Sequence, residues 1–292
     1  MENNNEKSPS SDGIFSDLER SGGRKTDHWL IASLISVLLV LIGGGCTSLA
    51  LNAAGLPNDF AFLGIWILTL LYLCLSPEDR PFLSMLKPNR TGNRPVLFLI
   101  GLLLGAGAVT LPILGAILCR SIHVSPSGES AGRILCLMAA TFVQAGAEEL
   151  VFRGVLYQKL RRRYIPPVLA VTINSIVFTA LHLPNDGINF WGFLTLLGIA
   201  VLTSLLVLHF DSLWGAMAFH TAWNFLQSGV FGLKNSGITV DGTILQQDGA
   251  VSSGFFYDEG FGVEGSPAAC LILGLLILLL LLHAKKQAAE PV

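Results

Sequence analysis

Residues Ile134–Leu160 read ILCLMAATFVQAGAEELVFRGVLYQKL, and they give the clearest indication of the fold. Its length suits a membrane-spanning helix, which needs about 20 mostly apolar residues. It nevertheless contains Gln144, Glu148, Glu149 and Arg153, although a charged side chain at the centre of a bilayer costs about 2.5–3.5 kcal/mol. Because such side chains are tolerated where they face the protein interior, the stretch predicts a helix inside a bundle, with a polar site on its inner face.

Apolar segments of similar length recur along the chain of 292 residues, of which 52% are apolar and 13% are charged. A soluble domain carries about 25% charged residues, so the composition indicates a membrane protein. The expected helices are 29–53, 60–75, 96–119, 134–160, 168–183, 190–208, 213–231 and 267–282. The predicted fold class is therefore all-α, a polytopic transmembrane helical bundle of about eight spans.

The positions of Lys and Arg predict the orientation of this bundle, since cytoplasmic loops carry an excess of these residues. With the N-terminus inside, the inner segments hold 14 of the 18 Lys and Arg residues, the outer segments hold 3, and Arg153 lies within a span. Both termini are thus expected in the cytoplasm. That arrangement requires an even number of spans, which eight satisfies.

Polar segments divide the chain around this domain. Residues 1–27 are predicted to form a disordered cytoplasmic tail and residues 284–292 a short cytoplasmic tail. The transmembrane domain between them covers 28–283. It is interrupted at 233–264 by an outer loop that is rich in Gly and acidic residues and has Lys234 as its one basic residue.

Charge and cysteine content exclude other classes of protein. The formal net charge is -2, and no basic surface of the kind that binds nucleic acid is present, so no nucleic-acid partner is expected. The five cysteines form no C-x-x-C pair, which disfavours a cysteine-based zinc or redox site.

The spacing of the polar residues separates the two acids of the fourth segment. Glu149 and Arg153 are four residues apart, so they share a helix face and can form an ion pair. Glu148 points about 100° away from Glu149 and is expected to face a cavity. In the fifth segment Asn174, Phe178 and His182 follow one another at intervals of four, and in the seventh His220 and Asn224 do the same.

These residues resemble three motifs of the intramembrane proteases grouped as CAAX prenyl endopeptidases and bacteriocin-processing or self-immunity proteins. The matching positions are, in chain order, Glu148-Glu149-x-x-x-Arg153, Phe178-x-x-x-His182 and His220-x-x-x-Asn224. Each motif lies on its own expected helix. The resemblance covers residues 132–229, which hold four of the eight segments.

The resemblance implies endopeptidase chemistry inside the bilayer, at a bond near or within it. Carried over by residue, Glu148 activates a water molecule that His182 helps to hold, and His220 with Asn224 stabilises the oxyanion. Glu149 and Arg153 would be a structural pair that orients Glu148. A second assignment makes Glu148, His182 and His220 ligands of a zinc ion, because two histidines, a carboxylate and a water form an open catalytic zinc site. The sequence leaves both assignments open.

Two other functions remain at this stage, namely a catalytically inactive membrane scaffold or immunity protein of the same fold, and a secondary transporter. The expected partners are membrane lipid and a peptide or membrane-protein substrate, in a bacterial plasma membrane. Hydrolysis requires water, so we expect a polar cavity that opens on the cytoplasmic side beside 161–163, which are all Arg. Separately, Gly101-x-x-x-Gly105 is expected to allow close helix packing.

Overall fold

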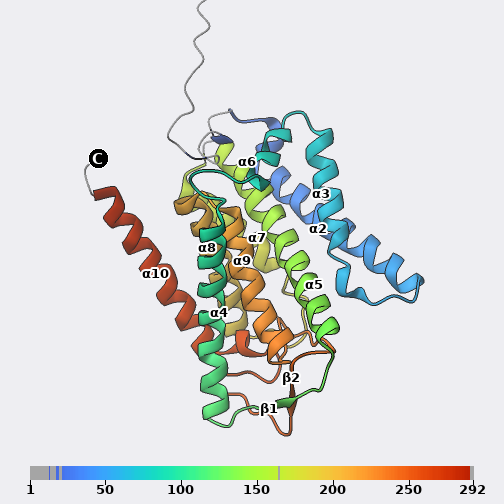
Figure 1. Cartoon of the computed structure of the whole chain (residues 1–292). Helices are drawn as coiled ribbons and strands as arrows, with labels where there is room; N and C mark the ends of the chain where they lie inside the picture. The colour runs from blue at the N-terminus through green and yellow to red at the C-terminus, as the bar shows by residue number, and fades with distance from the viewer. Residues whose placement is uncertain (1–12, 14–17, 20–21, 164, 290–292) are drawn as a thin grey trace, which may run out of the picture.

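The computed structural model describes residues 13, 18–19, 22–163 and 165–289. It is a helical bundle, as predicted, with loops and one small sheet across one end (Figure 1). The helices are α2 (Trp29–Ala53), α3 (Leu63–Leu75), α4 (Pro95–Leu118), α5 (Ala131–Glu149), α6 (Tyr157–Arg162), α7 (Pro167–Ala180), α8 (Phe190–Phe210), α9 (Leu213–Asn224) and α10 (Pro267–Ala289). Two π-helical segments, η4 (Leu150–Leu156) and η5 (Phe225–Val230), continue α5 and α9.

Each predicted apolar segment contains a helix, and the all-α class is confirmed. In the described part of the chain, six helical stretches are long and apolar enough to cross a membrane. The helices α7 and α9 are shorter, at 14 and 12 residues. The number of complete crossings therefore stays a prediction.

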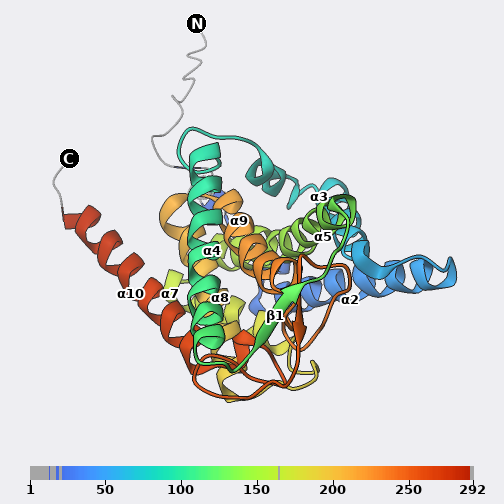
Figure 2. The same cartoon turned by 60° about the horizontal axis from the view of Figure 1, so that its bottom comes forward.

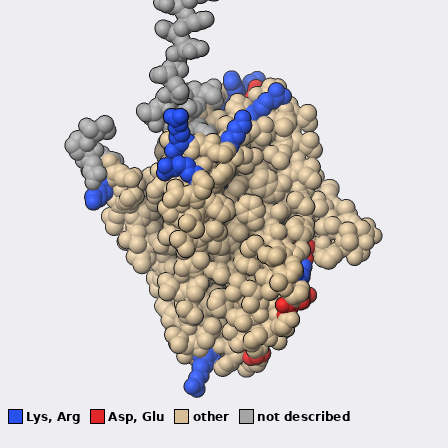
Figure 3. Space-filling model, in the orientation of Figure 1, with Lys and Arg blue, Asp and Glu red and all other residues tan. Residues whose placement is uncertain are grey.

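Charge is distributed unequally between the two ends of the bundle. Figure 3 shows most of its visible Lys and Arg atoms at the end where α10 finishes, and most of its visible acidic atoms farther toward the opposite end. This is the asymmetry on which the predicted orientation depends. Most of the expected tail 1–27 lies outside the described residues, and so do residues 290–292 of the other tail.

Residues just before α2 belong to the folded body at this end. Asp27 is fully buried and forms an ion pair with Arg162 at 2.6 Å, and Arg162 also pairs with Asp79 at 2.5 Å. Lys159 lies 2.7 Å from Asp79. Arg162 is thus a buried structural cation rather than a solvated one.

Close contact between α4 and α9 places α9 at the centre of the bundle. A Cβ atom on Gly101 would lie 2.3 Å from the carbonyl oxygen of Gly215, and one on Gly105 would lie 2.2 Å from that of Phe219. Only glycine permits this approach. The expectation of close packing at Gly101-x-x-x-Gly105 is confirmed, and it fixes the height of His220, one residue after Phe219.

The loop between α9 and α10 is ordered over the end of the bundle. Its strand β2 (Leu245–Asp248) pairs antiparallel with β1 (His123–Pro126), which follows α4. Seen from that end, the strand and the loop lie across the helices (Figure 2). The soluble loop expected at 233–264 therefore forms a cover, whose inner surface belongs to the site.

Candidate active site

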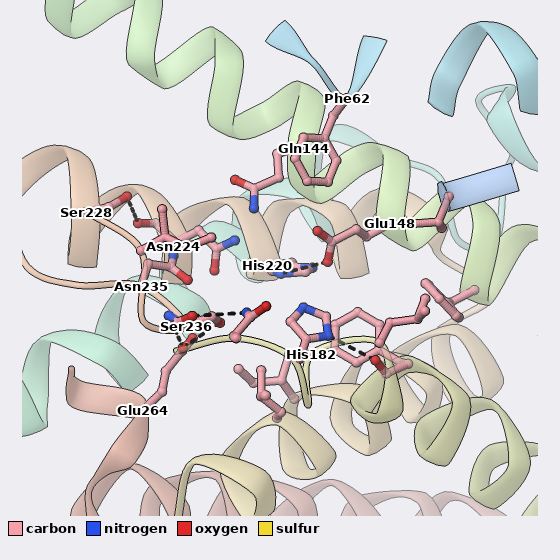
Figure 4. Close-up of a pocket in the computed structure, with 18 of the residues that line it drawn as sticks. Phe62, Gln144, Glu148, His182, His220, Asn224, Ser228, Asn235, Ser236 and Glu264 are labelled. Carbon is pink, nitrogen blue, oxygen red and sulfur yellow. Dashed lines mark hydrogen bonds and ion pairs between the residues drawn. The ribbon is translucent and has the colours of Figure 1, made fainter. Parts of the chain in front are cut away.

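A pocket of about 230 Å³ lies between α5, α7, α8, α9 and the loop that follows η5. Four predicted site residues line it: Glu148 from α5, His182 just after α7, and His220 and Asn224 from α9. Their side chains converge on one space in Figure 4. The predicted meeting of three separate helices around one cavity is therefore present in the structure.

The two helices that carry most of these residues change their winding at the motifs. The α-helical winding of α5 ends at Glu149 and that of α9 ends at Asn224, and π-helical segments follow both. Short π segments in α-helices are frequent at functional sites. Gln158 donates its Nε2–H to the carbonyl of Arg153 within this region, at 3.2 Å.

Glu149 joins α5 to α9 behind the pocket. Its Oε1 lies 3.2 Å from a terminal nitrogen of Arg153 and 2.8 Å from Nδ1 of His220. Arg153 also donates to the carbonyl of Ala200 in α8 at 2.9 Å. The predicted pairing of Glu149 with Arg153 is present, and the same carboxylate oxygen also bonds to His220 on α9, a contact that the sequence did not predict. The effect of this pair on Glu148 stays a prediction.

Phe178 explains the spacing of the motif on α7. Its ring centroid lies 4.7 Å from that of His182 and 6.2 Å from that of His220. The guanidinium carbon of Arg153 lies 4.8 Å from the same centroid, within the range of a cation–π contact. One buried aromatic ring thus packs against both imidazoles and the buried cation.

The hydrogen bonds of the two histidines decide which nitrogen faces the pocket. Nδ1 of His182 lies 2.9 Å from the carbonyl oxygen of Phe178, which can only accept, so Nδ1 carries the proton and Nε2 is left for the pocket. His220 contacts Glu149 through Nδ1, and its Nε2 lies 3.8 Å from Oε2 of Glu148. That distance exceeds a direct hydrogen bond.

The sequence reasoning missed the part of the site that the loop supplies. Asn235, Ser236 and Glu264 line the pocket opposite Glu148 (Figure 4). Glu264 is buried at 1% exposure. Burial raises the pKa of its carboxyl group, against hydrogen bonds from Ser236 and Trp223 that favour the ionised form. The sequence offers one signal for this part of the site, which is the acidic residue Glu264 shortly before the last apolar segment.

The pocket does not lie beside 161–163, where the sequence predicts a polar cavity. The pocket is lined by loop residues, and 161–163 are not among its lining residues. Those arginines lie at the end of α6, which is the opposite end of the bundle from β1 and β2 (Figure 1). The polar cavity therefore faces the end covered by the loop.

The placement of the donor atoms bears on the zinc assignment. No three His, Cys, Asp or Glu side chains in the described ranges are grouped so that they could hold one metal ion. The side chains as placed do not fit a zinc site made of Glu148, His182 and His220.

Comparison with known proteins identifies the region around these motifs. Residues 130–226 match a family model described as type II CAAX prenyl endopeptidase Rce1-like. This range holds every predicted site residue and agrees with the range of the motif resemblance. The comparison with curated proteins and that with solved structures gave no match.

Proposed function

The chain carries a type II CAAX prenyl endopeptidase Rce1-like domain at residues 130–226, and from this we propose that it is an intramembrane endopeptidase that uses Glu148 as its general base. The six long apolar helical stretches among the described residues, together with the family, indicate a multi-pass membrane protein. We further propose a bacterial plasma membrane as its location and a peptide or membrane protein as its substrate.

One observation carries the proposal. Oε2 of Glu148 and Nε2 of His220 face each other at 3.8 Å in a pocket that His182 and Asn224 also line. The gap is too wide for a direct hydrogen bond and leaves Oε2 of Glu148 available to a water molecule. A general base must come within about 2.6–3.2 Å of the proton donor, or reach it through one water.

In the proposed reaction, Glu148 takes a proton from water while the water oxygen attacks the carbonyl carbon of the peptide bond. Nε2 of His182 accepts a hydrogen bond from that water, because its Nδ1–H is held by the carbonyl of Phe178. The protonated Glu148 then gives its proton to the leaving nitrogen as the C–N bond breaks. No other proton acceptor is needed.

His220 and Asn224 stabilise the negative charge on the carbonyl oxygen in this proposal. The Glu149 carboxylate holds Nδ1 of His220, which favours the imidazolium form and directs Nε2–H into the pocket. The side-chain amide of Asn224 supplies a second donor. Removing one such donor typically lowers kcat by about 10²–10³-fold.

The test compares the purified wild-type protein with Glu148→Gln in lipid vesicles, using a library of internally quenched peptides. We expect cleavage by the wild type and a rate at least about 10²-fold lower for the variant, as for loss of a general base. Glu259→Gln is the matched control, because it removes the same charge at an exposed site in the loop and should cleave normally.

Equal cleavage by Glu148→Gln would show that the base is misassigned. No cleavage by the wild type would instead support the inactive scaffold or the transporter. Metal analysis of the same active samples, before and after a chelator, tests the zinc assignment directly: stoichiometric zinc together with loss of activity on chelation would replace the mechanism above.

A further inference from the structure

The most unusual backbone in the site belongs to the loop that covers it. Residues 235–238 form a tight turn in which Asn235 N–H bonds to the carbonyl of Ile238 at 2.8 Å and Ile238 N–H to that of Asn235 at 2.9 Å. Ser236 has a φ of 48° and Gly237 a φ of 83°. These values are those of a type I′ turn, and a serine in this region is strained.

Every polar group of Ser236 is bound. Its backbone N–H and its hydroxyl group donate to Oε2 of Glu264, at 2.7 and 2.8 Å. Its carbonyl accepts from Nδ2 of Asn185 at 3.0 Å. The surrounding structure therefore dictates the conformation of the turn, which explains how a strained residue is kept there.

The groups that bind Ser236 belong to the elements that carry the site. Asn185 lies three residues after His182, in the same connection between α7 and α8. Glu264 accepts at its other oxygen from Nε1 of Trp223, at 2.9 Å, and Trp223 is the residue before Asn224 on α9. The position of the turn is thus coupled to both histidine-bearing segments.

The turn also forms a wall of the pocket. Asn235, Ser236 and Ile238 line it, and Figure 4 places Ser236 and Glu264 on the far side of the cavity from Glu148. Because the N–H and the hydroxyl group of Ser236 are already bound to Glu264, the side-chain amide of Asn235 is the group of this wall that can pair with the backbone of an extended peptide. Glu264 has no part in the water activation described above, yet it is a buried acid bound on both oxygens.

We propose that Glu264 is a positioning residue, which through Ser236 holds the turn 235–238 as the wall that aligns a peptide substrate opposite Glu148. This inference rests on the proposed function and adds to it a determinant of substrate binding. It also assigns a role to the loop, which supplies the part of the site that lies outside the matched range 130–226.

Glu264→Gln is the decisive variant because it keeps the shape of the side chain. A glutamine has one acceptor oxygen and an amide that donates, so it cannot accept from both Trp223 and Ser236. We expect the turn to be released and KM for the best library peptide to rise about 10-fold or more with kcat within about threefold, the pattern of lost substrate binding. Glu259→Gln, the exposed control, should keep the wild-type KM.

Hydrogen exchange provides a readout that does not depend on catalysis. In Glu264→Gln, exchange at the amides of 236–238 should become faster while α5 and α9 keep their protection, since local opening frees only the turn. If Glu264→Gln does not fold, Ser236→Ala replaces it, because it removes the hydroxyl donor and leaves the bond between Glu264 and Trp223. The KM of Ser236→Ala should also rise, by a smaller factor.

The outcomes separate the two proposals. An unchanged KM, or a loss of kcat accompanied by faster exchange throughout α9, would overturn the positioning role while leaving the endopeptidase assignment in place. No cleavage by the wild-type protein would overturn both.

Discussion

Glu149 and His220 are 71 residues apart in the sequence, and a 2.8 Å hydrogen bond joins them behind the pocket. The bond links α5, which carries Glu148, to α9, which carries Asn224. It also fixes the ring of His220 so that Nε2 is directed at Glu148. The relative position of base and oxyanion donor thus depends on a carboxylate that does not line the pocket.

Replacing Glu149 should therefore damage catalysis more than substrate binding. Glu149→Gln keeps an acceptor oxygen but removes the negative charge that Oε1 presents to both Arg153 and His220. We expect kcat to fall about 10–100-fold with little change in KM, because the lost interaction acts in the transition state. Steady-state kinetics with the best library peptide measure this, and a change confined to KM would contradict the assigned role of Glu149.

Arg153 should matter mainly for stability. It is fully buried and balances the buried Glu149, so Arg153→Met leaves an uncompensated charge. Breaking a buried pair in this way costs about 3–5 kcal/mol. Thermal unfolding in detergent should show the loss, and the double variant Arg153→Met/Glu149→Gln should recover part of it. If the double variant is less stable than either single variant, loss of the ion pair is not the cause of the destabilisation.

The contact between α4 and α9 gives a test with an internal control. Gly105→Ala places a Cβ 2.2 Å from the carbonyl oxygen of Phe219, whereas a Cβ on Gly107 of the same helix meets nothing within 4 Å. We expect Gly105→Ala to destabilise the protein by about 1–3 kcal/mol, as overpacking does. Gly107→Ala should be neutral or slightly stabilising. If both variants unfold at the same temperature, α4 and α9 accommodate the added methyl group of Gly105→Ala without a loss of stability.

The ion-pair cluster at the opposite end of the bundle predicts a pH dependence. Burial opposes ionisation of Asp79, but hydrogen bonds from Lys159, Tyr72 and Arg162 outweigh it and hold the pKa of this carboxyl below its ordinary value. The stability that this provides is complete above the unfolded-state pKa of about 3.9 and is lost as pH falls through the lower folded-state pKa.

We therefore expect the unfolding temperature to drop on the acid side of about pH 4. Asp79→Asn should unfold at a lower temperature at pH 7, because Lys159 and Arg162 lose a partner, and should respond less to acid. If the unfolding temperature of Asp79→Asn falls with pH below about 4 as steeply as that of the wild type, other carboxyl groups control acid unfolding.

Much of the architecture could be predicted because its signals are local. An apolar run long enough to span a bilayer identifies a helix by itself, and the spacing of four in Glu149 and Arg153 places both on one face. The same spacing places Phe178 and His182 on one face, and in the structure their ring centroids lie 4.7 Å apart. The bond between Glu149 and His220 could not be predicted in this way, since the two residues lie on different helices.

The helices, the polar face of each helix and the acid that is free for the pocket follow from the sequence alone, because helical periodicity depends on residues that are close together in the chain. Three features depend on tertiary packing: Glu149 bonds to His220, the loop covers the cavity, and Glu264 binds Ser236 in its wall. The loop has no periodic pattern, and its conformation depends on hydrogen bonds to residues from Asn185 to Glu264. Such contacts exist only once the helices have packed.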